Sequence, residues 1–245
     1  MHILVIGESC TDVWNYGEVP RLCPEGPAPI FVPTRSCSNP GMAGNVVANL
    51  KALGATVGFI TNPNPITKTR YCDEKTNHLL LRVDVGDKDV QPVLYDFTEK
   101  FLAQYDAVVI SDYRKGFITE EHIFSICNSH DHVFIDTKKV VTPAFRMAKY
   151  IKINNYEYFL SETSIKSVPG LIDKIIITLG KDGCKLGDKV YPVPTVEVRD
   201  SAGAGDTFLA ALAYKYMETK DINKAITFAN ECSTYVVSRR GVVTV

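Results

Sequence analysis

Short runs of apolar residues recur along the chain, and helix-forming stretches separate them. Uninterrupted apolar strands of this kind are typical of a mostly parallel sheet that is covered on both faces. The pattern predicts strands over residues 3–6, 56–60, 107–111, 133–136, 150–153 and 175–179. Apolar residues at helical spacing predict helices over residues 43–53, 119–128, 205–217 and 222–238. We therefore expect an α/β fold.

Two stretches, 28–37 and 66–85, instead alternate apolar and polar residues. Alternation is typical of strands with one exposed face, so these stretches cannot be central strands of the parallel sheet. We expect a small antiparallel sheet that projects over the ligand crevice, as a lid or as a dimer surface, with lid segments at about 12–37 and 66–85. No repeat or linker divides the chain, so residues 1–245 are predicted to form one domain.

The composition of the chain excludes several classes of protein. Its 245 residues are 45% hydrophobic, and its net charge of −1 without long basic runs argues against a nucleic-acid partner. Seven scattered cysteines without a Cys-x-x-Cys pair are typical of reduced thiols, not of a disulfide framework or a zinc site. There is neither a signal peptide nor an apolar run that could span a bilayer. We expect a soluble, cytoplasmic protein with no membrane partner.

The segment Asp200-Ser201-Ala202-Gly203-Ala204-Gly205-Asp206 precedes a predicted helix and carries the clearest chemistry. Its two glycines let the backbone turn tightly, and the exposed amides at a helix N-terminus suit a phosphoryl group. Asp206 lies in the first helical turn beside them. Amides that bind a phosphoryl group and an adjacent carboxylate are the fewest groups needed to transfer that phosphoryl group to a hydroxyl. A flexible loop with an aspartate cap is the alternative interpretation. The segment is neither a Walker A loop nor a dinucleotide fingerprint.

Polar residues also follow several predicted strands, at the edge where open α/β sheets bind ligands. Asn154 and Glu157 could hold Mg²⁺, although Asn followed by Glu three residues later equally begins a helix. Lys115 and Lys138 follow two other strands and could meet phosphate oxygens, or could be ordinary solvated lysines. The glycine-bearing turn at 178–183 could lie against a nucleotide or simply open a hairpin.

Three residues near the N-terminus are candidates for binding a sugar. Asp12 follows the first predicted strand and could bind a hydroxyl. Asn45 lies at the start of a predicted helix, where its amide could bond sugar hydroxyls, and Gly41 would let the ligand approach the backbone closely.

Together these residues resemble the ribokinase-like carbohydrate kinases of the PfkB family, whose signature is Asp-Thr/Ser-x-Gly-Ala-Gly-Asp. Within that family, the chain is most similar to the D-glycero-β-D-manno-heptose 7-phosphate kinases, including the kinase half of the bifunctional heptose kinase/adenylyltransferase. Segment 21–29, Arg-Leu-Cys-Pro-Glu-Gly-Pro-Ala-Pro, resembles the subfamily's Arg-x-Ser-Pro-Glu-x-Pro-x-Pro. Segment 111–116, Ser-Asp-Tyr-Arg-Lys-Gly, resembles its Ser-Asp-Tyr-x-Lys-Gly.

The resemblance implies a ribokinase-like fold, ATP and Mg²⁺ as cofactors, and a particular set of site residues. It makes Asp206 the catalytic base, and it implies that the amides of 202–206 form an anion hole, with Ala202, Gly203, Ala204 and Gly205 ahead of the base. Asn154 and Glu157 match the family's magnesium motif. The implied ATP site contains Thr178, Gly180, Gly183 and Asn230, and the implied sugar site contains Asp12, Gly41 and Asn45. A phosphorylated sugar also needs cations, for which Arg21, Lys115 and Lys138 are candidates.

The chain departs from the subfamily pattern at three places. Gly41-Met42 stands where Gly-Gly is usual, and Asp136-Thr137-Lys138 stands where Asp-Pro-Lys is usual. Segment 61–65 leads almost directly into the lid-like strands, where relatives carry a further helix and strand. This shortening is expected to leave one edge of the main sheet bare.

Our leading hypothesis is transfer of the γ-phosphoryl group of ATP to a hydroxyl of a sugar phosphate, with heptose 7-phosphate as the first candidate, by a homodimer joined through the β lid. Asp206 would accept the hydroxyl proton, with a pKa that the helix N-terminus lowers. Two alternatives stay open. Met42 favours a PfkB-family kinase for another sugar or a nucleoside, and the shortening favours a non-catalytic protein that binds nucleotide or sugar phosphate.

Overall fold

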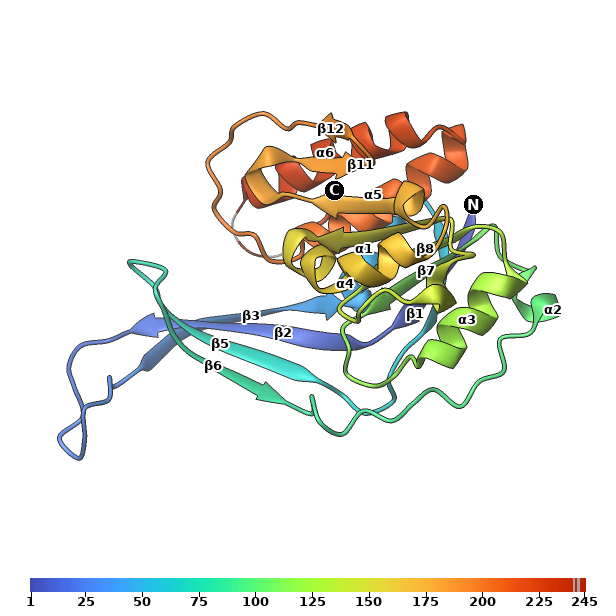
Figure 1. The fold of residues 1–245 in the computed structure, drawn as a ribbon. Coiled ribbons are helices and arrows are strands. Elements are labelled where there is room, and N and C mark those ends of the chain that lie inside the picture. Colours follow the sequence, from blue (N-terminus) through green and yellow to red (C-terminus); the bar gives the residue numbers. More distant parts are fainter. Residues whose placement is uncertain (240, 242) are drawn as a thin grey trace.

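Residues 1–239, 241 and 243–245, which the computed structural model describes, form one sheet of eight strands and a second sheet of four. Helices pack on both faces of the larger sheet, and the smaller sheet projects away from it (Figure 1). The predicted α/β fold with a small second sheet is therefore confirmed. No helix in the described part of the chain combines the length and the apolar composition that crossing a bilayer requires.

The larger sheet contains all of the predicted apolar strands. They are β1 (His2–Gly7), β4 (Thr56–Ile60), β7 (Ala107–Asp112), β8 (Val133–Thr137), β9 (Tyr150–Asn154) and β10 (Ile175–Thr178). These six strands pair with one another in parallel. A hairpin of β11 (Cys184–Leu186) and β12 (Lys189–Tyr191), which the apolar pattern did not predict, continues the sheet in antiparallel fashion. The order is β12-β11-β10-β9-β8-β7-β1-β4.

Two hydrophobic clusters lie on opposite faces of this sheet, as the alternation along β1 shows. Ile3 and Val5 pack with the cluster of α1 (Ala43–Ala52), α5 (Ala204–Thr219) and α6 (Ile222–Val237). Leu4 and Ile6 pack with the cluster of α3 (Glu120–Ser129) and α4 (Asn155–Ser167). Shorter helical segments are α2 (Glu99–Leu102), η1 (Pro143–Phe145), η2 (Ile172–Lys174) and η3 (Gly180–Asp182). Helices α1, α3, α5 and α6 match the predictions within two residues, whereas α2 and α4 were not predicted.

The smaller sheet, which we call the lid, contains β2 (Ser9–Glu18), β3 (Val32–Met42), β5 (Thr67–Asp73) and β6 (Leu79–Val85) in the order β3-β2-β5-β6. The pairs β2–β3 and β5–β6 are antiparallel, whereas the central pair β2–β5 is parallel. Strand β3 starts four residues later than predicted and runs on to Met42. It includes Pro40, which a sheet tolerates because β3 is an edge strand.

Strand β4 forms one edge of the larger sheet and pairs only with β1 in the described chain. The chain then passes through residues 61–66 into β5 of the lid. This agrees with the bare edge expected from the shortened sequence.

Candidate active site

Asp206 lies in the first turn of α5 and is only 3% exposed. Gly203 precedes the helix with a φ of 79°, a left-handed conformation that glycine adopts without strain. The pKa of Asp206 is raised to about 6, because burial, with a smaller contribution from nearby Asp136, outweighs the hydrogen bonds from Tyr113 and Asn45 that lower it. The prediction of a lowered pKa was therefore wrong, because loss of hydration outweighs the effect of the helix terminus.

Both oxygens of Asp206 accept hydrogen bonds from side chains of other elements. The Tyr113 hydroxyl donates to Oδ1 at 2.6 Å, and Asn45 Nδ2 donates to Oδ2 at 3.2 Å. Asn45 Nδ2 also lies 3.3 Å from the carbonyl oxygen of Gly203, and its Oδ1 accepts from Asn49 at 3.1 Å. Asn45, predicted to bind sugar, thus holds the carboxylate and the loop before α5 together.

Some of the backbone amides at the N-terminus of α5 donate hydrogen bonds within the protein, and others do not. The amide of Ala202 donates to Asp200 Oδ1 at 2.9 Å, and that of Ala204 donates to the carbonyl of Ser201 at 3.3 Å. Within the described residues, the amides of Gly203, Gly205 and Asp206 donate no hydrogen bond. The anion hole that these amides could form is therefore narrower than the predicted set and is centred on the two glycines.

A buried ion pair lies against Gly205. Lys152 Nζ is 2.6 Å from Asp136 Oδ2, and both side chains are about 5% exposed or less. A Cβ at position 205 would lie 2.8 Å from Lys152 Nζ, so a larger residue there would displace the end of the lysine side chain. The sequence interpretation missed Lys152, although a lysine inside an apolar strand was a signal that it has a buried partner.

The predicted magnesium residues form the start of α4. The amide of Glu157 donates to Asn154 Oδ1 at 2.9 Å, and the amide of Asn154 donates to Glu157 Oε2 at 2.7 Å. This is the capping box that the alternative interpretation expected. Lys138 Nζ lies 2.7 Å from Glu157 Oε1 and 3.9 Å from Asp136 Oδ1.

The carboxylate oxygens around Lys138 nevertheless suit Mg²⁺ as ligands. Asp136 Oδ1 is buried and has no hydrogen-bond partner among the residues that the structure describes. Mg²⁺ commonly binds one or two carboxylates and completes its shell with water and substrate phosphates. Asp136 and Glu157 provide such a pair, and the described chain holds no group of three or more His, Cys, Asp or Glu side chains that could bind a metal.

Glu8, which the sequence interpretation also missed, organises the loop after β7. Its side chain is fully buried and accepts hydrogen bonds from the amides of Tyr113 at 2.8 Å, Lys115 at 3.0 Å and Phe117 at 3.2 Å. A buried carboxylate that receives several amide donors is well stabilised. Glu8 therefore fixes the backbone that presents Tyr113 to Asp206.

The predicted sugar-binding residues lie where the lid leaves the core. Asp12 is 8% exposed and forms an ion pair with Arg70. A Cβ at position 41 would lie 2.1 Å from Asp12 Oδ2, so Gly41 makes room for this carboxylate. A cavity of about 340 Å³ adjoins Asn39 and Asn45.

The predicted phosphate-binding cations are not brought together. Arg21 lies in the exposed loop between β2 and β3, at the end of the lid remote from the larger sheet (Figure 1). Lys115 forms an ion pair with Asp87, and Lys138 contacts Glu157. Arg21 is thus separated from the residues around Asp206.

The predicted ATP residues lie around β10 and the hairpin that follows it. Gly183 has a φ of 82°, and a Cβ there would lie 2.1 Å from the carbonyl oxygen of Tyr191. Asn230 Nδ2 donates to the same carbonyl at 3.0 Å and lines a cavity of about 520 Å³. Gly180 adopts a φ of 62° in the turn, and Thr178 ends β10. Asn230 thus lines this cavity, and Gly183 packs against the carbonyl of Tyr191, another residue of its wall.

In this fold, a buried carboxylate beside unbonded amides at a helix N-terminus is an arrangement that suits transfer of a phosphoryl group to a hydroxyl. The chain belongs to the pfkB family of carbohydrate kinases, whose sequence pattern matches residues 76–245. The Bifunctional protein HldE of a Nitratiruptor species is 31% identical over 289 aligned positions, which cover 99% of this chain and 62% of that protein. The HldE of Helicobacter pylori is 28% identical, over 98% of this chain and 63% of that protein.

The chain thus spans less than two thirds of the length of these curated relatives. Among solved structures, a ribokinase from Thermotoga maritima has a TM-score of 0.70 at 18% identity and covers 98% of this chain and 94% of its own. Arabidopsis thaliana ribokinase complexed with ribose and ATP has a TM-score of 0.67 at 17% identity, over 98% of this chain and 93% of its own. These neighbours confirm the ribokinase-like fold.

Proposed function

We propose that this protein transfers the γ-phosphoryl group of ATP to a hydroxyl of a sugar phosphate, with heptose 7-phosphate as the first acceptor to test. The observation that carries the proposal is Asp206, a buried carboxylate in the first turn of α5, beside the amides of Gly203 and Gly205, which donate no hydrogen bond within the described chain. The similarity of segments 21–29 and 111–116 to heptose 7-phosphate kinases supports the choice of acceptor.

In this proposal Asp206 accepts the proton of the acceptor hydroxyl. A carboxylate with a pKa of about 6 is ionised at neutral pH and is a stronger base than an exposed aspartate. Tyr113 and Asn45 hold it in one orientation. The amides of Gly203 and Gly205 would stabilise the charge on the transferred group, which is the larger contribution in a loose phosphoryl transition state.

The cofactors of the proposed reaction are ATP and Mg²⁺. Asp136 and Glu157 would hold the metal, with Asn154 fixing Glu157 through the α4 cap. When bound, Mg²⁺ would neutralise charge on the phosphates of ATP. Thr178, Gly180, Gly183 and Asn230 would border the nucleotide, in keeping with the cavity beside Asn230.

The test compares the wild type with Asp206→Asn in an ADP-release assay with heptose 7-phosphate. We expect a loss of at least about a hundredfold in kcat, the usual scale for removal of a general base. Glu218→Gln, on an exposed part of the same helix, is the control and should keep normal turnover. Near-normal turnover of Asp206→Asn would contradict the proposed role.

A second candidate is a kinase for another sugar or a nucleoside, which Met42 favours. Met42 is buried and has a φ of 57°, a conformation that costs a non-glycine residue on the order of 1–3 kcal/mol. Retained strain of this kind often occurs beside functional sites. ADP release measured with a panel of sugars and nucleosides separates the two candidates. A wild type that binds nucleotide or sugar phosphate but turns over no acceptor would instead support the non-catalytic alternative.

We also propose that two copies associate through the lid. Leu79, Leu81, Val83 and Val85 of β6 are 51%, 55%, 39% and 59% exposed. The last three lie on the face opposite to the charged residues Arg82 and Asp84, because side chains alternate along a strand. A self-complementary apolar face of this kind suits a two-fold contact. The cytoplasmic location stays a prediction.

A further inference from the structure

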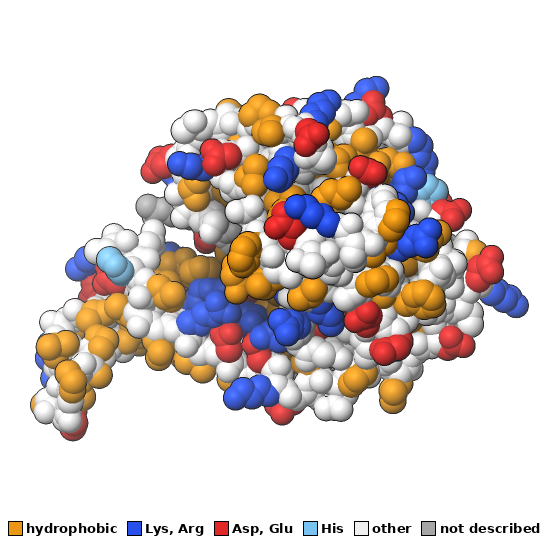
Figure 2. Space-filling model, viewed as in Figure 1, with side chains coloured by type: hydrophobic (Ala, Val, Ile, Leu, Met, Phe, Trp, Pro, Cys, Tyr) orange, Lys and Arg blue, Asp and Glu red, His pale blue; other side chains and the backbone are white. Residues whose placement is uncertain are grey.

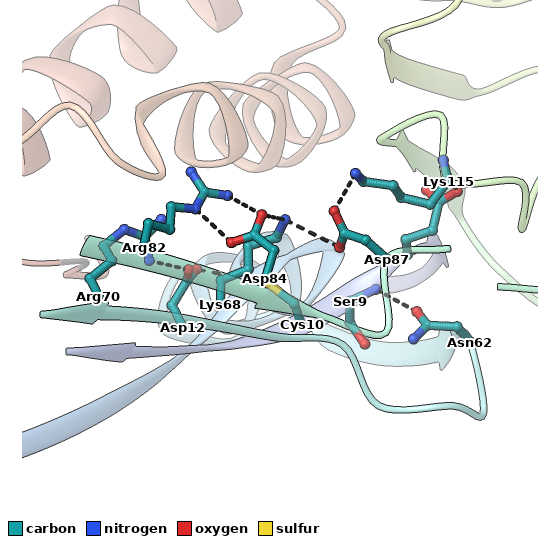
Figure 3. A network of polar contacts seen from close by, with 11 residues as sticks. Ser9, Cys10, Asp12, Asn62, Lys68, Arg70, Arg82, Asp84, Asp87 and Lys115 are labelled. Carbon is teal, nitrogen blue, oxygen red and sulfur yellow. Dashed lines mark hydrogen bonds and ion pairs between the residues drawn. The ribbon is translucent and has the colours of Figure 1, made fainter. Parts of the chain in front are cut away.

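One face of the lid carries a set of charged side chains. The strand register places Lys68 opposite both Asp12 and Asp84, and it places Arg70 opposite Arg82. These side chains rise together from the lid, as Figure 3 shows. Figure 2 shows Lys and Arg side chains gathered at the junction between the lid and the core.

The pairing of two arginines indicates that this face is shaped for an anion. Like charges in directly opposite positions destabilise a sheet. Arg70 and Arg82 are directly opposite each other on β5 and β6, and each forms an ion pair with a carboxylate that offsets the repulsion. Arg70 pairs with Asp12, whereas Arg82 binds Asp84 through Nε at 2.7 Å and Nη2 at 2.8 Å.

Lys68 has the least satisfied charge of the set. It is only 8% exposed, yet its ion pairs with Asp84 and Asp87 are both 3.4 Å long. Charge-assisted bonds from an ammonium group are normally about 2.7–2.9 Å, so its three donors have spare capacity. Lys115 reaches the same Asp87 from the core, from the loop that Glu8 holds.

The charges named here do not cancel. Lys68, Arg70, Arg82 and Lys115, which we call the basic cluster, face Asp12, Asp84 and Asp87. Four cations against three carboxylates leave one positive charge. A phosphate monoester carries about 1.5 to 2 negative charges at neutral pH, so the net positive charge of this face would attract it.

Cys10 shows that the basic cluster is close to the catalytic carboxylate. Burial, Asp12 and Asp206 raise the pKa of its thiol to about 12, while Lys68 and Arg70 act in the opposite direction. The loop after β7 connects the cluster to Asp206 directly, because its Tyr113 donates to Asp206 Oδ1 and its Lys115, two residues further on, belongs to the cluster and pairs with Asp87. A small molecule with its hydroxyl at Asp206 would therefore extend toward the basic cluster.

We propose that Lys68, Arg82 and Lys115 bind the phosphate group of the acceptor sugar. This inference rests on the proposed function and deepens it, because it assigns the preference for a phosphorylated acceptor to strands β5 and β6 of the lid and to the loop after β7. The planar guanidinium of Arg82 binds a phosphate through two parallel bonds, in place of Asp84. Asp84 and Asp87 hold the three cations until the substrate arrives.

The chain's single tryptophan gives a direct measurement of binding. Trp14 lies on the same face, with the Arg70 guanidinium 4.6 Å from its ring centroid. Its fluorescence is followed while the full chain is titrated, without ATP, with heptose 7-phosphate, mannose 6-phosphate, inorganic phosphate and unphosphorylated heptose. Because no turnover is needed, failure of this proposal is distinguishable from failure of the kinase proposal.

We expect wild type to bind at least one sugar phosphate at least about tenfold more tightly than plain heptose, the scale of one charge-assisted bond. Arg82→Gln, and independently Lys115→Met from the core, should remove most of this preference and leave the affinity for heptose unchanged. Lys75→Met is the matched control, because Lys75 is a lid lysine with a 79% exposed side chain.

Three outcomes would overturn the proposal. If the variants lost affinity for phosphorylated and plain sugar equally, the ion pairs would serve only to join the lid to the core. If Lys75→Met lost the preference for sugar phosphate to the same extent, the preference would come from the overall charge of the protein and not from this site. A wild type with no phosphate-dependent signal for any of the probes would show that the face does not bind this group.

Discussion

The environment of Asp206 combines burial with hydrogen bonds to both oxygens. Burial raises its pKa, and the Tyr113 and Asn45 bonds limit that rise by stabilising the ionised form. The two effects leave the carboxylate ionised at neutral pH but more basic than usual. Tyr113 thus acts on the base, through its hydrogen bond to Oδ1.

The pH dependence of turnover should report this balance. Because a base works only when deprotonated, we expect kcat of the wild type to fall below pH about 6, the pKa of Asp206. Tyr113→Phe removes a bond to the ionised form, so the pKa rises and the acid limb moves to higher pH. Profiles between pH 5 and 9 measure this, with the exposed Tyr156→Phe as control. A limb that stays in place or moves to lower pH in Tyr113→Phe is the contrary result.

At this scale the sequence predicts local groups better than long-range contacts. Asp206 and the amides beside it were predictable because two glycines and an acid precede an apolar helix. Tyr113 belongs to a segment that the sequence singled out, but its contact joins residues 93 positions apart, which spacing does not report. The same holds for Lys152 against Gly205 and for Glu8 beneath the loop after β7.

Among the elements, the start of α5 and strand β9 meet at Gly205. Gly205→Ala would place a Cβ 2.8 Å from Lys152 Nζ, so the ammonium group would have to move from its 2.6 Å contact with Asp136. We expect the free energy of unfolding to fall by about 1–3 kcal/mol, the usual cost of overpacking, and turnover to fall with it. Urea unfolding measures the change. Gly26→Ala has nothing within 4 Å of its Cβ and is the control; equal stability of the two variants would contradict the packing argument.

Most elements could be predicted because their buried residues are apolar and periodic. Helix α4 could not, since its buried residues are Glu157, Ser161 and Ile165, two of which are polar. Strand β3 was placed too early because its residues are mostly exposed, and its pairing with β2 extends its end through Pro40 and Gly41. The bounds of β3 therefore depend on its pairing with β2, which the local sequence pattern does not report.

For the whole molecule, we expect association through the outer face of the lid. The double variant Leu81→Lys/Val83→Glu places charges on that face and should weaken self-association at least about tenfold, because buried unpaired charges are costly. Sedimentation velocity across micromolar concentrations measures the dimer. Leu94→Lys, at a residue that is 99% exposed outside the lid, is the control. A monomeric wild type, or a double variant that still dimerises, would rule out this contact.

The position of β4 has a consequence for how such proteins diverge. The alignment with the Nitratiruptor relative spans 289 positions, 44 more than the 245 residues of this chain. Strand β4 ends the sheet, so in the described structure a neighbour can be gained or lost there without changing how β1 pairs with β7. An insertion or deletion at this border can thus change the length of such a chain and leave the pairing of its central strands intact.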